Sequence, residues 1–296
     1  AEGVLLLAPF CAEPLRVTLL GATCGGPTWR AVDALKHGPC AWMRSIFGID
    51  VVIDVARRQA FSSSSAGGSG DGAPGSSTSG APGSATLRCA PVREVAPIDA
   101  TAVGLVAKVR GVAYATRVSP ALCTRVVSAA RAVLHPLVSD LRVATDVASR
   151  RDAAPGGPGF GLVLVAETTE ARKIAVDRDS STTSSDDDAA DQSGRFFKDP
   201  EALARRTAHA LLDDLARQGV VDSLSQPLFL TLMALAKDDV SVATLPGPLS
   251  PAAVDRLRLI KTFFGLEFKL NFDPATTSVR CACVGVGYRN FAKKVT

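Results

Sequence analysis

The stretch from Gly219 to Gly265 constrains the fold more than any other part of this chain. Pro227–Ala236 is apolar nearly all round, which predicts a helix buried on every side. A short strand and a Gly-Pro loop follow. Ser250-Pro251 then offers a capping hydroxyl and a proline at the first position of a second helix, which runs to about Phe264. This order is typical of helices packed on a sheet. The stretch holds acids, Arg and Lys, but no His and no Cys.

The composition indicates an aliphatic core. Hydrophobic residues make up 47% of the 296 residues and aromatic residues only 5%, which suits mixed α/β packing in one large domain or two smaller ones. The best apolar run, Val4–Phe10, is far too short for a membrane span and has no basic flank, so we expect a soluble protein without a secretory signal. The chain opens without Met or a polar lead, which suggests a start inside a domain. A net charge of +4 permits contact with phosphates without requiring it.

The seven cysteines are an odd number without a CxxC pair, which argues against a disulfide framework and against a zinc finger. A reducing, intracellular setting is the simpler interpretation. Cys281 and Cys283 share one face of a predicted strand, and core packing is favoured for both. Structural roles are likewise favoured for the only histidines, His37, His135 and His209. We expect neither a metal nor a cofactor.

The first part of the chain predicts a helix and a hairpin. The helix covers Thr28–Phe47, weakened by a break at His37-Gly38-Pro39. Residues 62–84 contain nine Ser and seven Gly and no aliphatic side chain larger than Ala. Such a segment cannot bury enough surface to offset the entropy of ordering, so we predict a disordered insertion. It would enlarge the loop of a hairpin between strands at Ile49–Ala56 and Leu87–Val95.

The second part predicts further helices with clear start signals. Ser119-Pro120 begins a helix to about Leu134, and Asp199-Pro200-Glu201 begins one that ends at Gly219. Asp177–Ser193 reads as a polar linker. The other predicted strands are Arg16–Gly21, Leu105–Ala115, Leu141–Thr145, Leu162–Glu167, Ala171–Val176, Glu267–Phe272 and Val279–Val286. In the strand Glu267–Phe272, the side chains of Phe268, Leu270 and Phe272 lie on one face. The order indicates an α+β fold of units that each pack helices on one face of a sheet.

The Gly-Pro loop Pro155–Gly161 has two interpretations. Its glycines allow backbone N–H groups to converge on a phosphate. However, no Lys-Ser/Thr pair follows, and the loop leads into a strand rather than a helix N-terminus. A plain turn is favoured, and a small-molecule-binding protein has only this loop in its support.

Basic residues recur at the ends of predicted strands and along the last helix. Such positions can form an anion-binding face for RNA phosphates, and ordinary solvated charge explains them equally well. Aromatic residues for base stacking are few, with only Tyr114 and Tyr288 well placed. The candidate RNA- and anion-binding residues are Arg57, Arg58, Arg110, Arg117, Arg258, Lys261, Lys293 and Lys294.

Several segments together resemble a known family. They are LLLAPFCAEPLRVTLLGAT near the start, KVRGVAYATRVSPALCTRVVSAARAVL (108–134), PGFGLVLVAETT (158–169), GVVDSLSQPLFLTLMALAKDDVS (219–241), GPLSPAAVDRLRLIKTFFGLEFKL (247–270) and CVGVGYRNFAKKVT (283–296). They resemble the RNA 3′-terminal phosphate cyclase superfamily, and most closely its noncatalytic branch, which acts in eukaryotic ribosome assembly. The resemblance covers nearly all of the chain outside the two low-complexity segments.

The resemblance implies repeated units of two helices packed on a four-stranded sheet, with a smaller inserted α/β domain. On this basis we expect a core unit at 1–95, an insert at 96–218 and the last core repeat at 219–296, with the N-terminal repeat of the family missing.

Departures from the family bear on chemistry. The resemblance implies that true cyclases use a nucleophilic His in the last repeat to take AMP from ATP. The corresponding region here lies near Leu245–Arg256, and no His follows His209, so that nucleophile is missing. The Gly-rich turn that the family places after the pair equivalent to Arg57-Arg58 is replaced by the Ser/Gly insertion. Both differences argue against adenylation and cyclisation.

The resemblance therefore implies a noncatalytic scaffold in the nucleolar small-subunit processome, away from membranes. Its expected partners are a large ribosome-assembly GTPase, pre-ribosomal RNA and the small nucleolar ribonucleoprotein particle. The alternative is an RNA-processing enzyme, either a pre-rRNA endonuclease or an ATP-dependent RNA 3′-phosphate cyclase. A nuclease role in this branch would rest on basic and acidic residues in the last helix, and the matching run Arg258-Leu259-Ile260-Lys261 has no acid within it.

Overall fold

The computed structural model describes residues 2–26, 29–60, 82–148, 158–180 and 199–293. Its elements in chain order are α1 (Glu2–Leu7), η1 (Ala8–Phe10), β1 (Leu15–Leu20), α2 (Val32–His37), α3 (Pro39–Phe47), β2 (Val51–Arg57), β3 (Ser84–Cys89), β4 (Asp99–Ala100), β5 (Val106–Thr116), α4 (Ala121–Leu134), β6 (Leu141–Ala148), β7 (Gly159–Thr168), β8 (Lys173–Asp179), α5 (Pro200–Ala216), η3 (Ser223–Ser225), α6 (Gln226–Leu235), β9 (Val240–Pro246), α7 (Pro251–Phe264), β10 (Lys269–Asp273) and β11 (Ser278–Val284).

The fold is mixed α+β, and the described strands form three sheets. The first sheet has the order β1-β3-β2, the middle sheet β6-β5-β7-β8, and the last sheet β10-β11-β9-β4. The four strands that the resemblance implies for a core unit are therefore present in the last sheet. The first sheet has three strands among the described residues, which corrects that expectation for the first unit.

The first sheet contains the predicted hairpin. β2 and β3 pair antiparallel, as expected, although β3 ends at Cys89 and residues 90–95 do not continue it. The predicted helix over 28–47 is two helices, because the chain turns at Gly38 and Pro39 starts α3 afresh. Most of the Ser/Gly-rich segment 62–84 lies outside the described residues, and its last residue, Ser84, begins β3.

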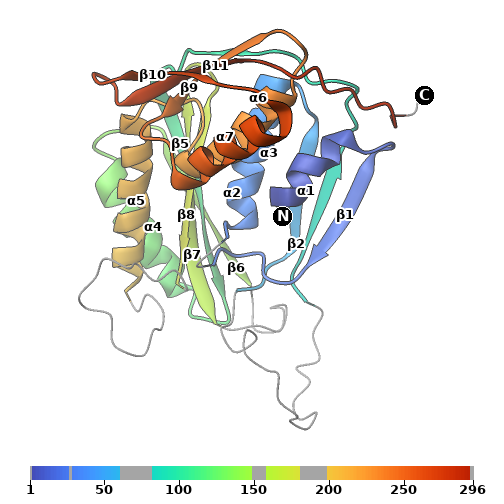
Figure 1. The fold of residues 1–296 in the computed structure, drawn as a ribbon. Helices are drawn as coiled ribbons and strands as arrows, with labels where there is room; N and C mark the ends of the chain where they lie inside the picture. The colour runs from blue at the N-terminus through green and yellow to red at the C-terminus, as the bar shows by residue number, and fades with distance from the viewer. Residues whose placement is uncertain (1, 27–28, 61–81, 149–157, 181–198, 294–296) are drawn as a thin grey trace, which may run out of the picture.

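The middle sheet is covered differently on its two faces (Figure 1). α4 and α5 pack on one face and bury an aliphatic core that includes Leu162, Leu164 and Leu203. α2, from the first unit, packs on part of the other face. The predicted linker 177–193 is wrong at its start, because Asp177–Asp179 belong to β8 and Asp179 is buried. These residues are polar and therefore resembled a linker in the sequence. They are ordered because their partners come from distant parts of the chain.

The last sheet includes a strand that the sequence pattern did not predict. β4 is only two residues long and pairs parallel with β9, so this sheet begins inside the span assigned to the insert. The division at 95/96 and 218/219 stays a prediction. Leu270 and Phe272 of β10 pair with Cys281 and Val279, whose side chains face the core, yet they remain 45% and 54% exposed. The helices do not extend far enough to cover this edge strand.

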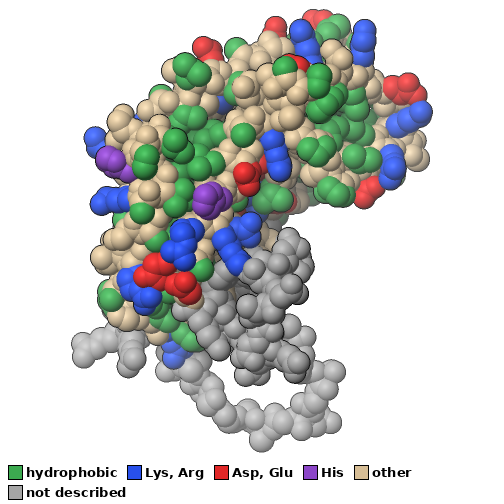
Figure 2. Space-filling model, turned by 90° about the vertical axis from the view of Figure 1, so that its left-hand side faces the viewer, with side chains coloured by type: hydrophobic (Ala, Val, Ile, Leu, Met, Phe, Trp, Pro, Cys, Tyr) green, Lys and Arg blue, Asp and Glu red, His purple; other side chains and the backbone are tan. Residues whose placement is uncertain are grey.

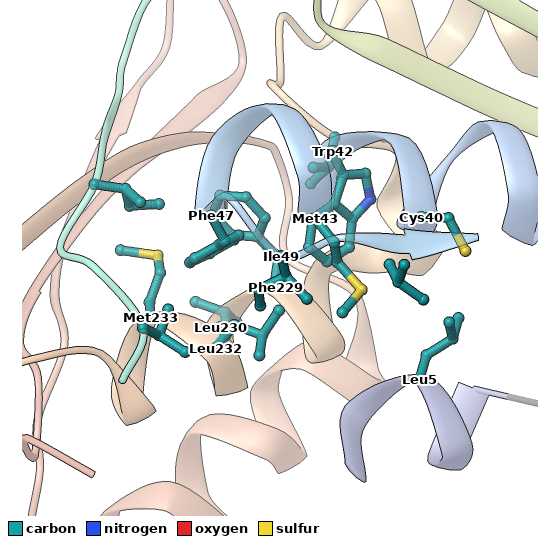
Figure 3. Close-up of a cluster of buried hydrophobic side chains, with 14 of the residues drawn as sticks. Leu5, Cys40, Trp42, Met43, Phe47, Ile49, Phe229, Leu230, Leu232 and Met233 are labelled. Carbon is teal, nitrogen blue, oxygen red and sulfur yellow. The ribbon is translucent and has the colours of Figure 1, made fainter. Parts of the chain in front are cut away.

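The first and last units share one hydrophobic core. Trp42 and Phe47 of α3 contact Phe229 of α6, with ring centroids 5.3 and 5.1 Å apart (Figure 3). The prediction of a buried helix at 227–236 is confirmed, since most of α6 is inaccessible to solvent. Edge-to-face aromatic packing of this kind fixes the two units relative to each other, because interior packing tolerates little displacement.

Candidate nucleic-acid interface

Arg30, just before α2, joins three parts of the chain through one guanidinium group. Its Nη1 donates to Oδ1 of Asp222 (2.9 Å) and to Oγ of Ser225 (3.0 Å), both next to α6. Its Nη2 donates to the carbonyl of Ala175 in β8 (2.7 Å), and its Nε lies 3.5 Å from Oδ1 of Asp177. The Arg30 and Asp222 side chains are only 5% and 1% exposed. The first unit, the middle sheet and the last unit therefore meet at a buried ion-pair network.

Hydrogen bonds from other groups hold the carboxylates of this network in place. The amide of Ala31 donates to Oδ2 of Asp177 (2.7 Å), and the amide and hydroxyl of Ser225 donate to Asp222. Burial raises the pKa of the Asp177 carboxyl above its usual range, although Arg30 and the Ala31 amide act in the opposite direction. Asp177 therefore depends on Arg30 to remain charged in the interior.

Arg58 makes a second buried ion pair beside the first. Its Nη1 lies 2.6 Å from Oδ2 of Asp33 and its Nη2 lies 2.7 Å from Oδ2 of Asp146. The guanidinium also lies 4.8 Å from the ring centroid of Tyr114. The Arg58 side chain is 5% exposed. We call the set Arg30, Arg58, Asp33, Asp146, Asp177 and Asp222 the junction network.

The junction network does not offer positive charge to an anion, because its two guanidinium groups face four carboxylates. Arg58, predicted from sequence as an anion-binding residue, is instead enclosed and holds the first unit to the middle sheet. Neighbouring groups are unreactive too. Burial raises the pKa of the Cys24 thiol to about 12 and that of the Tyr114 hydroxyl well above its ordinary value.

Three other candidates lie on or beside β2 and β5. Arg57 is exposed at the end of β2, and Arg117 is exposed just beyond β5 with a left-handed backbone (φ 57°). Arg110 lies within β5, where its Nη2 is 2.6 Å from Oδ2 of Asp140. That hydrogen bond lowers the pKa of Asp140 and raises that of Arg110. RNA binding by these side chains stays a prediction.

Two further candidates, Arg258 and Lys261, lie on α7. Its start is confirmed, since the Ser250 hydroxyl accepts from the Ala253 amide and Pro251 takes the first turn. Arg258 pairs with Asp255 at 3.2 Å, and Lys261 pairs with Glu267 at 2.6 Å. All four side chains are highly exposed, so their charges remain accessible to a ligand.

An apolar groove runs beside these charges. It has a volume of about 260 Å³ and lies between α7 and β10, with Leu257, Leu266, Phe268 and Leu270 among its lining. Phe263, at the end of α7, is 75% exposed. Figure 2 shows hydrophobic side chains gathered over the upper part of the molecule, with Lys, Arg, Asp and Glu side chains interspersed among them. Exposed apolar residues rimmed by charge are typical of an interaction surface.

The loop between β9 and α7 occupies the position where the resemblance places the cyclase nucleophile. Gln226 of α6, fully buried, fixes this loop: its Nε2 donates to the Pro246 carbonyl (2.6 Å), and its Oε1 accepts from the Ser250 amide (2.8 Å). The Ser250 hydroxyl caps α7. Cys281 and Cys283 are buried, as favoured from sequence, and burial raises the pKa of each thiol to about 12. These groups support the architecture rather than nucleophilic chemistry.

The last two candidates lie near the C-terminal end of the sequence. Lys293 is half-buried near the chain end, and Lys294 lies outside the described residues. Within the described parts of the chain, no group of three or more His, Cys, Asp or Glu side chains is placed to hold a metal ion. Over the same residues, every helix is too short or too polar to cross a lipid bilayer.

Sequence reasoning missed Arg30, Asp177 and Asp222, and it did not gather the eight candidates into one place. The candidates divide among the end of β2, the middle and end of β5, α7 and the last residues of the chain. The missed residues carry no local signal, because Arg30 is separated from Asp222 by 192 positions. Only a signal of pairwise covariation between distant positions would have found them.

Comparison with known proteins agrees with the fold. A family profile described as RNA 3′-terminal phosphate cyclase (RTC), insert domain, matches residues 101–216. The human protein named RNA 3′-terminal phosphate cyclase-like protein is 35% identical over 302 residues, covering 99% of this chain and 73% of the human one. The mouse protein of the same name is 34% identical over 303 residues with the same coverage. The Schizosaccharomyces pombe protein named rRNA processing protein rcl1 is 29% identical over 299 residues, covering 99% and 73%.

Proposed function

The chain belongs to the family of RNA 3′-terminal phosphate cyclase-like proteins, and from this membership we propose that it is a noncatalytic ribosome-biogenesis factor. It acts in pre-rRNA processing and in maturation of the small-subunit ribosomal RNA. It does so as a scaffold within the nucleolar small-subunit processome. Its partners are a large ribosome-assembly GTPase, pre-ribosomal RNA and the small nucleolar ribonucleoprotein particle.

One observation carries this proposal: the similarity extends over 99% of the chain, well beyond the insert domain, to relatives that include one named an rRNA processing protein. A match of that extent includes the core units as well as the insert, so the arrangement of surfaces is shared and not only one module. Because ribosomal RNA is processed in the nucleolus, we propose that the protein acts there.

The geometry of the β9–α7 loop supports the noncatalytic part of the proposal. Adenylation needs a nucleophile that attacks the α-phosphate of ATP. The last unit contains no His, its cysteines are buried with raised pKa values, and the Ser250 hydroxyl is engaged as a helix cap. Incubation of the purified chain with ATP labelled in the α-phosphate is expected to leave no stable protein–AMP adduct. A stable adduct would overturn the noncatalytic assignment.

The α7 surface supports the scaffold part. Arg258 and Lys261 present exposed charge that phosphates can compete for, because exposed ion pairs are weak. The groove beside them, with the exposed Phe263, suits an apolar segment of a protein partner. We assign contact with the GTPase and with RNA to this face.

The decisive experiment is purification of the tagged protein from nuclear extract, followed by mass spectrometry and RNA sequencing. The expected result is enrichment of pre-rRNA upstream of the mature small-subunit RNA, together with a large GTPase. A matched variant with Arg258→Glu and Lys261→Glu is expected to lose that enrichment, whereas Arg131→Glu, at an exposed position on α4, is expected to retain it. Recovery of neither RNA nor GTPase with the unaltered protein would contradict the proposal.

A pre-rRNA endonuclease is the second candidate, and one observation favours it. Although the run 258–261 has no acid within it, the structure brings Asp255 beside Arg258 and Glu267 beside Lys261. In each pair the carboxylate is a candidate general base, and the neighbouring cation can bind the phosphate of the substrate. Cleavage of purified pre-rRNA by the wild-type chain, lost on changing Arg258 and Lys261 to Ala while GTPase binding persists, would establish this candidate in place of the scaffold.

A further inference from the structure

The face of the middle sheet that carries α2 is only partly covered. Ala31, at the N-cap of α2, and Ala34 within it pack with Val163, Val165 and Ala175. It ends at His37, and beyond that residue the sheet surface is open. The opening is a pocket of about 380 Å³, within the size range of small-ligand sites. It is separate from the β9–α7 loop and from the groove beside α7, since it shares no lining residue with that groove.

The rim of this pocket is a cross-strand row of charges. Lys108 of β5 lies opposite Glu167 of β7, which lies opposite Lys173 of β8. The Lys108 Nζ is 2.9 Å and the Lys173 Nζ 3.6 Å from the Glu167 carboxylate. One carboxylate between two ammonium groups leaves an excess of positive charge. All three side chains are partly exposed, so an incoming anion can reach them.

Arg110 adds a guanidinium on the same face, two residues further along β5. Asp140 holds it from the side at 2.6 Å. With Asp140 counted, the three cations Lys108, Arg110 and Lys173 face two carboxylates, Glu167 and Asp140, which leaves an excess of one positive charge. The pocket is therefore electropositive in a chain whose acids and bases are otherwise nearly balanced.

The floor of the pocket is apolar. Val112 of β5 lies opposite Val163 of β7, and Val165 occupies the neighbouring position on β7. Val163 and Val165 are 0% and 7% exposed because α2 covers them, whereas Val112 is half-buried and accessible from the pocket. Arg110 lies opposite Val165 and borders the floor. A flat ring can therefore lie against Val112 while an attached phosphate reaches the rim. His37, whose pKa is lowered by burial, adds a neutral imidazole at the edge that can form a hydrogen bond with a ring substituent.

We infer that this pocket between the middle sheet and the end of α2 binds one unpaired nucleotide of single-stranded RNA, with its base against Val112 and its phosphate at Lys108 and Lys173. The inference rests on the proposed function, in that it names a second contact with the RNA. A paired base cannot enter such a pocket, because its edge and both faces are occupied in the duplex. The protein therefore selects single-stranded segments at this point.

The test measures binding of a fluorescein-labelled, unstructured 12-nucleotide RNA to the full chain by anisotropy across a salt series. Val112→Phe fills the floor without changing charge, and Lys173→Gln removes one rim charge. Val112→Phe is expected to weaken binding about tenfold with an unchanged salt slope, because stacking of a base is lost. Lys173→Gln is expected to weaken binding about threefold and to reduce the slope by about one. Arg131→Gln, the same charge change on exposed α4, is expected to have no effect.

The outcomes separate this inference from the proposed function. Wild-type affinity in both Val112→Phe and Lys173→Gln overturns the pocket while leaving RNA binding by other surfaces in place. Failure of the wild-type chain to bind the RNA overturns both. Thermal unfolding checks that the Val112→Phe variant is folded. If that variant does not fold, the RNA affinity of Lys173→Gln, a change at a partly exposed site, tests the pocket instead. A further measurement uses uridine monophosphate and inorganic phosphate: equal chemical-shift changes at Val112 and Val165 would show an anion site without base recognition, and would overturn the inference.

Discussion

The junction network and the α7 surface place the same kind of charge in opposite surroundings. Arg30 and Arg58 are 5% exposed and have their donors directed at carboxylates, a carbonyl and a hydroxyl. Arg258 and Lys261 stand in solvent with a single carboxylate partner each. The first pair links the first unit, the middle sheet and the segment before α6, and the second pair projects from one helix.

The difference shows how environment divides structural from functional charge. Breaking a buried ion pair by removing one partner costs about 3–5 kcal/mol, because an uncompensated charge is left in the interior. An exposed pair contributes about 0–1 kcal/mol, because water replaces either partner. A ligand phosphate can therefore displace Asp255 or Glu267 at little cost, whereas no ligand can displace Asp222 from Arg30. The junction network sets the geometry on which the exposed surfaces depend.

The largest expected effect is that of Arg30→Met. It leaves Asp177 and Asp222 buried without their counter-charge, so the free energy of unfolding should fall by about 3–5 kcal/mol, a large share of the about 5–15 kcal/mol typical of a protein. Chemical denaturation followed by circular dichroism measures the change. Arg16→Met, at an exposed position on β1, is the matched control and should change the free energy of unfolding by less than about 0.5 kcal/mol.

A double-mutant cycle sharpens the same point. If Arg30 acts mainly through Asp222, then Arg30→Met combined with Asp222→Asn should destabilise by less than the sum of the two single changes, with a coupling energy of about 1–3 kcal/mol. Equal falls in the free energy of unfolding for Arg30→Met and Arg16→Met would show that the buried arginine contributes no more to stability than the exposed one.

Arg58→Met is expected to have the next largest effect. Asp33 becomes buried without a partner, but Asp146 is 51% exposed and can be hydrated. The expected loss is therefore smaller, about 2–3 kcal/mol, which is in the range of a hydrogen bond to a charged group. Thermal unfolding measures it. A fall in the free energy of unfolding as large as that for Arg30→Met would mean that hydration of Asp146 does not compensate for the lost ion pair.

Features with local causes were predictable from the sequence. The Asp199-Pro200-Glu201 helix start is confirmed, since the Asp199 side chain accepts from the Glu201 amide (3.0 Å), because capping needs only neighbouring residues. The burial of α6 followed from its apolar composition. The start of the 177–193 linker was wrong and β4 was missed because both depend on partners far along the chain, namely Arg30 and β9. Arg58 looked like an anion-binding residue because charge is visible in a sequence and burial at a junction is not.

The combined change Arg258→Ala and Lys261→Ala tests the other side of the comparison. Because both cations and their acids are exposed, the free energy of unfolding should change by less than about 1 kcal/mol. Binding to RNA or to the GTPase should nonetheless weaken, about tenfold for RNA if two phosphate contacts are lost, and isothermal titration measures it. A large fall in the free energy of unfolding with unchanged binding would show that these residues have a structural role, like those of the junction network.

The smallest effect concerns the exposed pair between Arg125 of α4 and Glu201 of α5. Arg125 Nε and Nη2 donate to Glu201 Oε1 and Oε2 at 2.6 and 2.7 Å. This bidentate contact, with a hydrogen bond to Asp199, lowers the pKa of Glu201 from 4.5 to about 2. Because the folded pKa is lower than the unfolded one, the stabilisation is present above pH 4.5 and is lost as the pH falls toward 2. Glu201→Gln should therefore lower the melting temperature slightly at pH 6 and have no effect near pH 2.

The Arg125→Gln variant tests which group lowers this pKa. An NMR titration of that variant should find the pKa of Glu201 restored toward 4.5. A pKa unchanged by the substitution would show that the helix N-terminus, rather than Arg125, keeps the Glu201 carboxylate charged.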